Sequence, residues 1–122
     1  MELIFVGIGG ALGSITRYHL GKAVAQRSKN VQFPLGTFII NLSGAVLLGI
    51  VIGADVKGNL YMLMADGFLG AYTTFSTFMY EGFHLFQDNE KKNAAIYFLS
   101  TLILGIIGYM MGFGVCKILA KL

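Results

Sequence analysis

Apolar residues dominate two long stretches of this chain, and neither stretch contains a charged residue. Residues 31–54 and 93–116 hold no Asp, Glu, Lys or Arg. A helix of about 20 apolar residues is long enough to cross the hydrocarbon core of a bilayer. Two shorter charge-free runs, residues 3–16 and 67–80, are ended by charged residues before they reach that length. The pattern predicts four membrane-spanning helices, two uniformly apolar and two with polar residues inside them.

Polar segments separate the predicted helices. They leave spans of about 3–25, 34–53, 60–86 and 93–119, joined by polar connections at about 26–33, 55–59 and 87–92. Pro34, the only proline, stands where the second span begins, and its missing N–H is harmless there. Because no linker or low-complexity tract interrupts the chain, residues 1–122 are predicted to form a single transmembrane domain.

Composition strengthens this prediction. Of the 122 residues, 56% are apolar and 12% are charged, whereas a soluble domain carries about 25% charged residues. Too few polar residues remain to cover a soluble fold, so we expect an integral membrane protein with lipid over much of its surface. The net charge of +3 is small and spread over the connections, which does not favour nucleic-acid binding. No nucleophile–base pair, phosphate loop or metal-ligand cluster is visible, and we expect no enzyme activity.

Basic residues are nearly balanced between the two sides of the predicted bundle. An even number of spans places both termini on one side, and the side richer in Lys and Arg usually faces the cytoplasm. The terminal side carries Lys57, Lys117 and Lys121, and the other side carries Arg27, Lys29, Lys91 and Lys92. This small difference favours insertion in both orientations, although Arg17 and Lys22, within the first span, would increase the bias if they count with the second group.

The third span contains an unusual polar segment. Residues 67–78 read GFLGAYTTFSTF, which places two internal glycines and four Ser or Thr side chains inside a membrane helix. Non-helical backbone at membrane depth is tolerated only where it is buried in protein or lines a wet cavity. The segment therefore predicts a helix break between Gly70 and Thr74 that exposes carbonyls and hydroxyls to an ion. The alternative is that the hydroxyls simply bond their own helix.

Phe75 and Phe78 lie three residues apart and so share one helix face. An aromatic ring is positive at its edge, and two such edges beside hydroxyl donors can replace part of the water around an anion. They do this without a fixed charge, which would hold the ion too tightly for conduction. Lipid-facing or core packing is the alternative for both rings.

Further polar side chains lie inside the other spans. Asn41 offers two N–H donors to an anion, or bonds a neighbouring helix, and Thr37 precedes it by one turn. Tyr97 and Thr101 are four residues apart and can form one polar track. Intramembrane charges are functional candidates, but Arg17 and Glu81 lie toward span ends, where anchoring the fold is an equal alternative. His19 and His84 are expected to be interfacial side chains.

Three segments together resemble the Fluc/CrcB family of small four-span fluoride channels. They are residues 9–18 (GGALGSITRY), residues 34–44 (PLGTFIINLSG) and residues 67–78 with Glu81 beyond them. Their order and spacing fit over essentially the whole chain, and the TTFSTF block is the specific part.

The resemblance implies a passive, fluoride-selective channel of the plasma membrane that exports fluoride from the cytoplasm and so limits its toxicity. It further implies an antiparallel, dual-topology homodimer with two separate pores. Phe75 and Phe78 would form an aromatic box, Asn41 would be a pore-lining donor, and the hydroxyl lining would comprise Thr37, Ser76, Thr77, Tyr97 and Thr101. The backbone carbonyls of Gly70 and Thr73, from both subunits, would hold a structural Na⁺, and Arg17 would lie near the pore entrance. Some family members carry a serine beyond Tyr97 and Thr101 where this chain has Gly105.

Two other classes of membrane protein are alternatives to a channel. A small multidrug transporter also has four spans, but it uses a glutamate deep in its first span, and here Glu2 stands at the very start. A membrane scaffold would use its glycines for packing alone. Fluoride efflux from liposomes separates the three classes.

Overall fold

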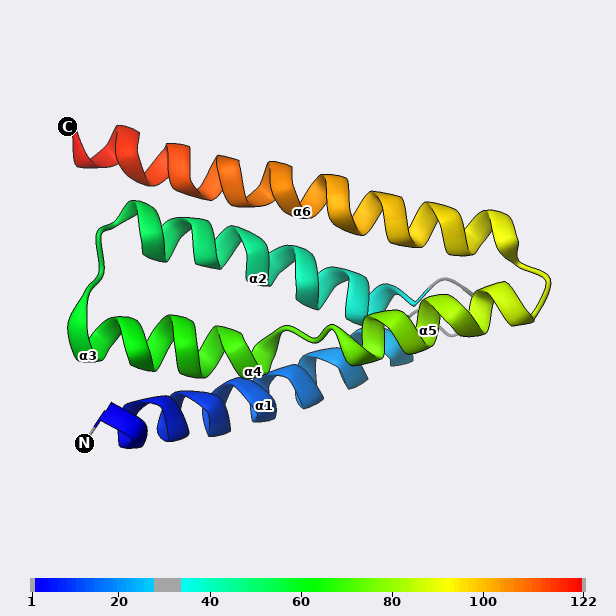
Figure 1. The fold of residues 1–122 in the computed structure, drawn as a ribbon, viewed down its shortest axis with the longest axis horizontal. Helices are drawn as coiled ribbons and strands as arrows, with labels where there is room; N and C mark the ends of the chain where they lie inside the picture. Colours follow the sequence, from blue (N-terminus) through cyan, green and yellow to red (C-terminus); the bar gives the residue numbers. More distant parts are fainter. Residues whose placement is uncertain (1, 28–33, 122) are drawn as a thin grey trace.

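The chain crosses the length of a helical bundle four times in the computed structural model, which describes residues 2–27 and 34–121 (Figure 1). The first, second and last crossings are the continuous helices α1 (Glu2–Arg27), α2 (Leu35–Gly53) and α6 (Lys91–Ala120). The third is divided into α3 (Gly58–Tyr61), the π-helix η1 (Met62–Leu69), α4 (Gly70–Tyr72) and α5 (Ser76–Gln87). Both ends of the chain lie at the same end of the bundle, as an even number of spans predicts (Figure 1).

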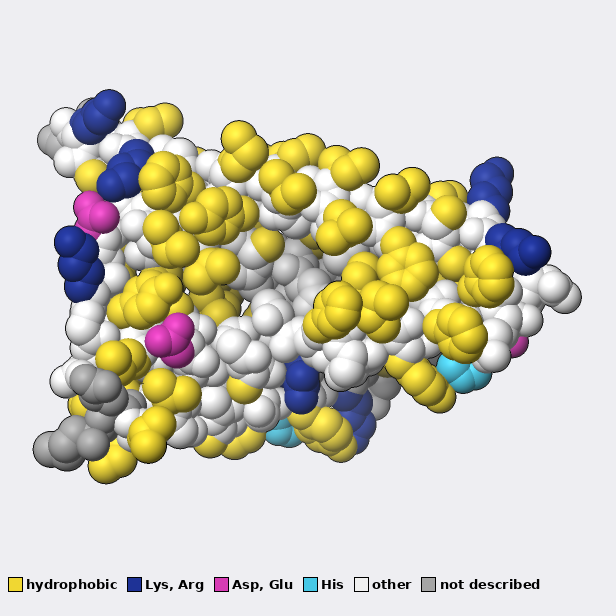
Figure 2. Space-filling model, viewed as in Figure 1, with side chains coloured by type: hydrophobic (Ala, Val, Ile, Leu, Met, Phe, Trp, Pro, Cys, Tyr) yellow, Lys and Arg dark blue, Asp and Glu magenta, His cyan; other side chains and the backbone are white. Residues whose placement is uncertain are grey.

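The bundle has the surface expected of a membrane protein. Within the described residues, three helices are long and apolar enough to span a bilayer on their own, namely α1, α2 and α6. Only 6% of the most apolar window of α6 is buried within this chain, so the remainder is left for lipid or another protein. On the face shown in Figure 2, apolar side chains cover the length of the bundle, and most Lys and Arg side chains lie at its two ends.

The first helix extends two residues into the predicted connection at 26–33. α1 continues through Arg27, and residues 28–33 lie outside the described part of the chain. The other two connections are short turns, in which Asp55 and Asn89 adopt positive φ angles of 56° and 63°.

Small residues allow the helices to approach closely in two pairs. α1 packs along η1, and a Cβ at Gly13 would lie 2.1 Å from the carbonyl oxygen of Phe68. α2 packs along α6, and a Cβ at Gly112 would lie 2.4 Å from the carbonyl oxygen of Val46. Close packing of this kind is how helices associate in lipid, where burial of apolar surface gives little driving force.

The glycines of α6 do not all serve this packing. Gly108 and Gly112 both face Val46 of α2, as their helical spacing predicts. A Cβ at Gly105 would meet nothing within 4 Å, so Gly105 takes no part in this packing against α2.

The third crossing bends, but later than the sequence predicts. Gly70 is helical (φ −61°, ψ −35°), and the helix continues through Tyr72. Thr73 then turns extended (φ −80°, ψ 158°), and regular helix resumes at Ser76. The break therefore occupies Thr73–Phe75, and the expectation that it starts at Gly70 is corrected. Two buried clusters flank it, one around Tyr72 and Ile40 and the other around Phe78 and Tyr97.

Candidate functional site

The Asn41 side chain on α2 occupies the break in the third crossing. Its Nδ2 donates to the Thr74 carbonyl over 3.0 Å, and its Oδ1 accepts from the Thr74 N–H over 3.0 Å. Backbone groups at membrane depth need such partners when the helix does not supply them. Asn41 therefore bonds a neighbouring segment, which is the alternative to a role as a donor to an anion. An amide carries two N–H donors, and the bond to Thr74 uses one of them.

The break also changes the surroundings of two carbonyl groups. In an α-helix, the Gly70 carbonyl would accept from the Thr74 N–H, and the Thr73 carbonyl would accept from the Thr77 N–H. The Thr74 N–H donates to Asn41 instead, and the Thr77 N–H donates to the Thr74 hydroxyl over 3.3 Å. Both carbonyls thus lose the amide that a continuous helix would give them.

Two further residues of α2 shape the backbone at the break. A Cβ at Gly44 would lie 2.3 Å from Cγ2 of Thr73, so only glycine allows Thr73 to approach this closely. One position earlier, the Ser43 hydroxyl lies 2.8 Å from the Tyr72 hydroxyl. Asn41, Ser43 and Gly44 together fix the end of α4 against α2.

The two phenylalanines have different surroundings. Phe78 is 6% exposed, whereas Phe75 is 70% exposed on the surface of the chain. Their ring centroids lie 6.1 Å apart with a tilt of 49°. The rings are therefore neighbours, as their spacing predicts, but only Phe78 is enclosed by this chain.

Phe78 is held by aromatic residues of α6. Its ring centroid lies 5.2 Å from that of Tyr97 and 5.1 Å from that of Phe98, and the second pair meets edge to face. A Cβ at Gly82 would lie 2.1 Å from Cζ of Phe98, so Gly82 makes room for this ring. Neither Phe98 nor Gly82 was singled out from the sequence, because both lie in ordinary apolar helix and only tertiary contact brings them to Phe78.

The hydroxyl residues divide into two groups. Tyr97 is fully buried, and the buried Thr101 donates its hydroxyl to the Tyr97 carbonyl over 2.7 Å, a bond within its own helix. Ser76 and Thr77 are exposed in the first turn of α5. The candidate polar track on α6 and the hydroxyls at the break therefore belong to different elements.

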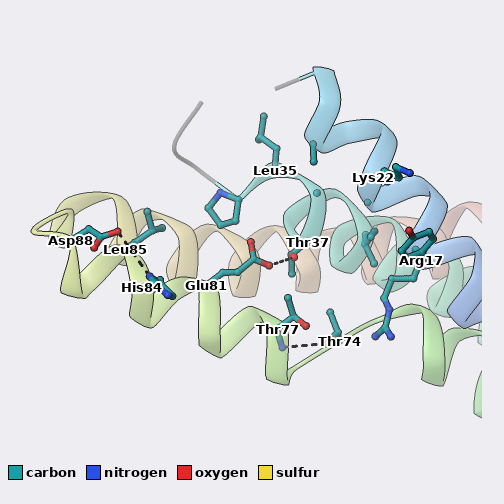
Figure 3. Close-up of a pocket in the computed structure, with 16 residues that line it drawn as sticks. Arg17, Lys22, Leu35, Thr37, Thr74, Thr77, Glu81, His84, Leu85 and Asp88 are labelled. Atoms are coloured by element: carbon teal, nitrogen blue, oxygen red, sulfur yellow. Dashed lines mark hydrogen bonds and ion pairs between the residues drawn. The ribbon is translucent and has the colours of Figure 1, made fainter. Parts of the chain in front are cut away.

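A polar cavity of about 790 Å³ extends to the break from the end of the bundle at which α1 ends and α2 begins (Figure 3). α1 contributes Arg17 and Lys22 to its wall, and α2 contributes the buried Thr37. The third crossing contributes, among others, Thr74, Thr77, Glu81, His84 and Asp88.

Thr37 and Glu81 join two walls of this cavity. The Thr37 hydroxyl donates to Oε1 of Glu81, so α2 and α5 are connected at this level (Figure 3). The structure thus brings together Arg17, Glu81 and Thr37, which the sequence placed on three separate spans. Thr74 and Thr77 lie on the same cavity wall as Glu81.

Comparison with known proteins gives one consistent result. Residues 4–113 match the family described as CrcB-like protein, Camphor Resistance (CrcB). The chain is 58% identical over 112 residues to the fluoride-specific ion channel FluC 2 of Clostridium acetobutylicum, covering 92% of this chain and 95% of that protein. It is 43% identical to FluC 2 of Bacillus cereus, with 92% and 94% covered, and 38% identical to FluC of Acidobacterium capsulatum, with 92% and 93% covered. The chain therefore belongs to the CrcB/FluC family of fluoride-specific ion channels, which are multi-pass membrane proteins and not enzymes.

Proposed function

We propose that this protein is a passive channel that conducts fluoride out of the cytoplasm across the plasma membrane. The observation that carries the choice of ion is the 58% identity, over 92% of the chain, to a protein named as a fluoride-specific ion channel. The break at Thr73–Phe75 and the polar cavity that reaches it support a channel, because irregular backbone at this depth is tolerated beside a wet cavity.

The pathway begins in the polar cavity and continues past the break. Thr37, Ser76 and Thr77 line its first part, and the second N–H of Asn41 serves as a donor to the ion. The edges of Phe75 and Phe78 then replace water, and Tyr97 and Thr101 follow on α6. For Thr101 to donate to an anion, its hydroxyl must turn away from the Tyr97 carbonyl. None of these groups is a fixed positive charge, so the ion is bound weakly enough to leave.

The working unit in this proposal is an antiparallel homodimer with two pores. Phe75 supports it, because a ring that is 70% exposed beside a buried Phe78 makes only half of an aromatic box. A second copy would cover Phe75 and much of the exposed apolar surface. Basic side chains lie at both ends of the bundle (Figure 2), which is compatible with insertion in either orientation.

The carbonyl groups of Gly70 and Thr73 fit a structural Na⁺ at the centre of such a dimer. Both lose the amide partner that a continuous helix would supply, and carbonyl oxygens can replace the hydration shell of an alkali cation. Gly70 is also exposed on the surface of the chain. Two carbonyls from each copy would give the ion four oxygen ligands, which would lock the two breaks together.

Efflux from liposomes tests the function directly. Purified protein would be reconstituted into liposomes loaded with fluoride, and the release of fluoride would be followed with a fluoride-sensitive electrode while a potassium ionophore clamps the voltage. We expect rapid fluoride release without a proton gradient, and none from protein-free liposomes. Proton-coupled exchange of a cationic drug without fluoride release would overturn the proposal in favour of a multidrug transporter.

A further inference from the structure

His84 lies on α5 in the wall of the polar cavity, near its open end (Figure 3). Its side chain is 54% exposed. Nε2 lies 3.2 Å from the Tyr80 hydroxyl, and Nδ1 lies 4.0 Å from Oδ2 of Asp88. The imidazole is thus oriented by contacts one turn away on either side, while it remains open to water.

The charges around the cavity are otherwise balanced. Among the described residues that line it, α1 contributes the cations Arg17 and Lys22, and α5 contributes the anions Glu81 and Asp88. The two positive and two negative charges of these described residues cancel. The described lining residues of α2 are uncharged; they are Leu35, Gly36, Thr37 and Ile40. A proton on His84 would therefore add one positive charge that no other described lining residue offsets.

We propose that His84 is a proton-controlled anion-recruiting group, which makes the mouth of the cavity positive at mildly acidic pH and draws small anions toward Thr74 and Thr77. This inference rests on the proposed fluoride conduction. Histidine changes its charge between about pH 5 and pH 8. A cleft with walls of low dielectric constant focuses the field of such a charge and raises the local concentration of the opposite ion.

The contacts of His84 suit this role. Protonated imidazole has two N–H donors, so it can donate to the Tyr80 hydroxyl through Nε2 while Nδ1 faces the Asp88 carboxylate. Asp88 is 71% exposed, so water and salt screen its charge. Because the imidazolium also stays half open to water, it recruits anions without binding one tightly, and conduction continues.

Acidification of one side of the membrane would therefore increase fluoride capture at an opening that faces that side. An antiparallel pair would present one such cavity to each side of the membrane, so both openings would respond to the pH outside them.

Single-channel recording in planar bilayers tests the inference. Fluoride should be well below saturation and ionic strength low, with both chambers at about pH 7.5 or about pH 5.5, which bracket the titration of imidazole. We expect the fluoride conductance of the natural protein to be about two- to threefold higher at the lower pH, as one added charge near the ion path predicts. Raising the ionic strength with an impermeant salt should bring this ratio toward one.

Two substitutions at the same position separate charge from packing. His84→Gln keeps a hydrogen-bonding side chain but cannot become charged, so its conductance should stay at the neutral-pH value of the natural protein at both pH values. The conductance of His84→Lys should stay at the acidic-pH value of the natural protein at both pH values. His19→Gln is the matched control, because the other histidine packs on Tyr18 of α1, and it should keep the natural pH ratio.

An unchanged pH ratio in His84→Gln, or a low conductance of His84→Lys at both pH values, would overturn the inference while leaving fluoride conduction intact. A pH ratio that persists at high ionic strength would also overturn it, because recruitment by charge must be screened. Absence of fluoride current from the natural protein at either pH would instead overturn the proposed function, and the inference with it.

Discussion

Asn41 and Thr74 are joined by two hydrogen bonds of 3.0 Å, although 33 positions separate them in the chain. The side-chain amide of Asn41, on α2, thus supplies both hydrogen-bond partners that a regular helix would give the N–H and the carbonyl of Thr74. The break in the third crossing is therefore maintained from α2, and glycine within the third crossing is not what creates it.

Replacing Asn41 should destabilise the break. Asn41→Ala removes the hydrogen-bond partners of both the Thr74 N–H and the Thr74 carbonyl. Each buried polar group left unsatisfied costs about 1–3 kcal/mol. We expect a lower unfolding temperature in detergent and loss of fluoride efflux from liposomes. Asn41→Asp retains the acceptor for the Thr74 N–H, so it should recover part of the stability, but its charge should still prevent fluoride passage.

Asn93→Ala is the control for this substitution. Asn93 also uses its side-chain amide, donating to Oε2 of Glu90 over 2.8 Å, but it does so at the first turn of α6. Equal losses of stability and efflux in Asn93→Ala and Asn41→Ala would contradict a specific role for Asn41.

Isoleucine substitutions should separate the two phenylalanines. We expect both Phe75→Ile and Phe78→Ile to abolish fluoride efflux, because each removes an aromatic edge from the proposed pathway. Only Phe78→Ile should lower stability markedly, by about 1–2 kcal/mol, since Phe78 is 6% exposed and Phe75 is 70% exposed. Thermal unfolding in detergent and liposome efflux are the two measurements, and normal efflux in both variants would refute the pathway.

Serine at position 105 tests the departure from other family members. Gly105 continues the spacing of Tyr97 and Thr101, and a Cβ there would meet nothing within 4 Å. Gly105→Ser should therefore fold normally and conduct fluoride at least as well as the natural protein. Gly112→Ser on the same helix should fold poorly, because its Cβ would lie 2.4 Å from the Val46 carbonyl oxygen. Similar stability losses in the two variants, measured by unfolding in detergent, would contradict this account.

The antiparallel dimer predicts two orientations for one sequence. A cysteine added at the N-terminus should be labelled from both sides of the membrane by impermeant reagents, in about equal amounts. The native Cys116 would first be replaced by Ala so that only the added thiol reacts. Labelling from one side alone would exclude the antiparallel arrangement without excluding a channel.

The arrangement of helices was largely predictable from the sequence. Runs without charged residues located α2 and α6, because a span that faces lipid cannot carry exposed charge. The combination of glycine and hydroxyl residues in 67–78 predicted a break, and the third crossing is indeed divided there.

The position of the break and the composition of the cavity were not predictable in this way. The break lies at Thr73–Phe75 because Asn41 binds Thr74 and Gly44 makes room for Thr73, and both contacts come from another helix. Likewise, the sequence predicts only an interfacial side chain at His84. The residues next to it in the chain do not indicate that it shares a cavity with Arg17 of α1. Periodicity reports which face of a helix is buried, but not which neighbour meets it.

The depth of the cavity also affects how the bundle would respond to voltage. Water that fills a cavity as far as Thr74 has a high dielectric constant and supports little of the potential difference between the two sides. Most of the membrane potential would then fall across the remaining thickness, between Thr74 and the end of the bundle where α2 and α6 end. An anion would reach the break almost without electrical work, and its later movement past that point would carry nearly all of the voltage dependence of the current.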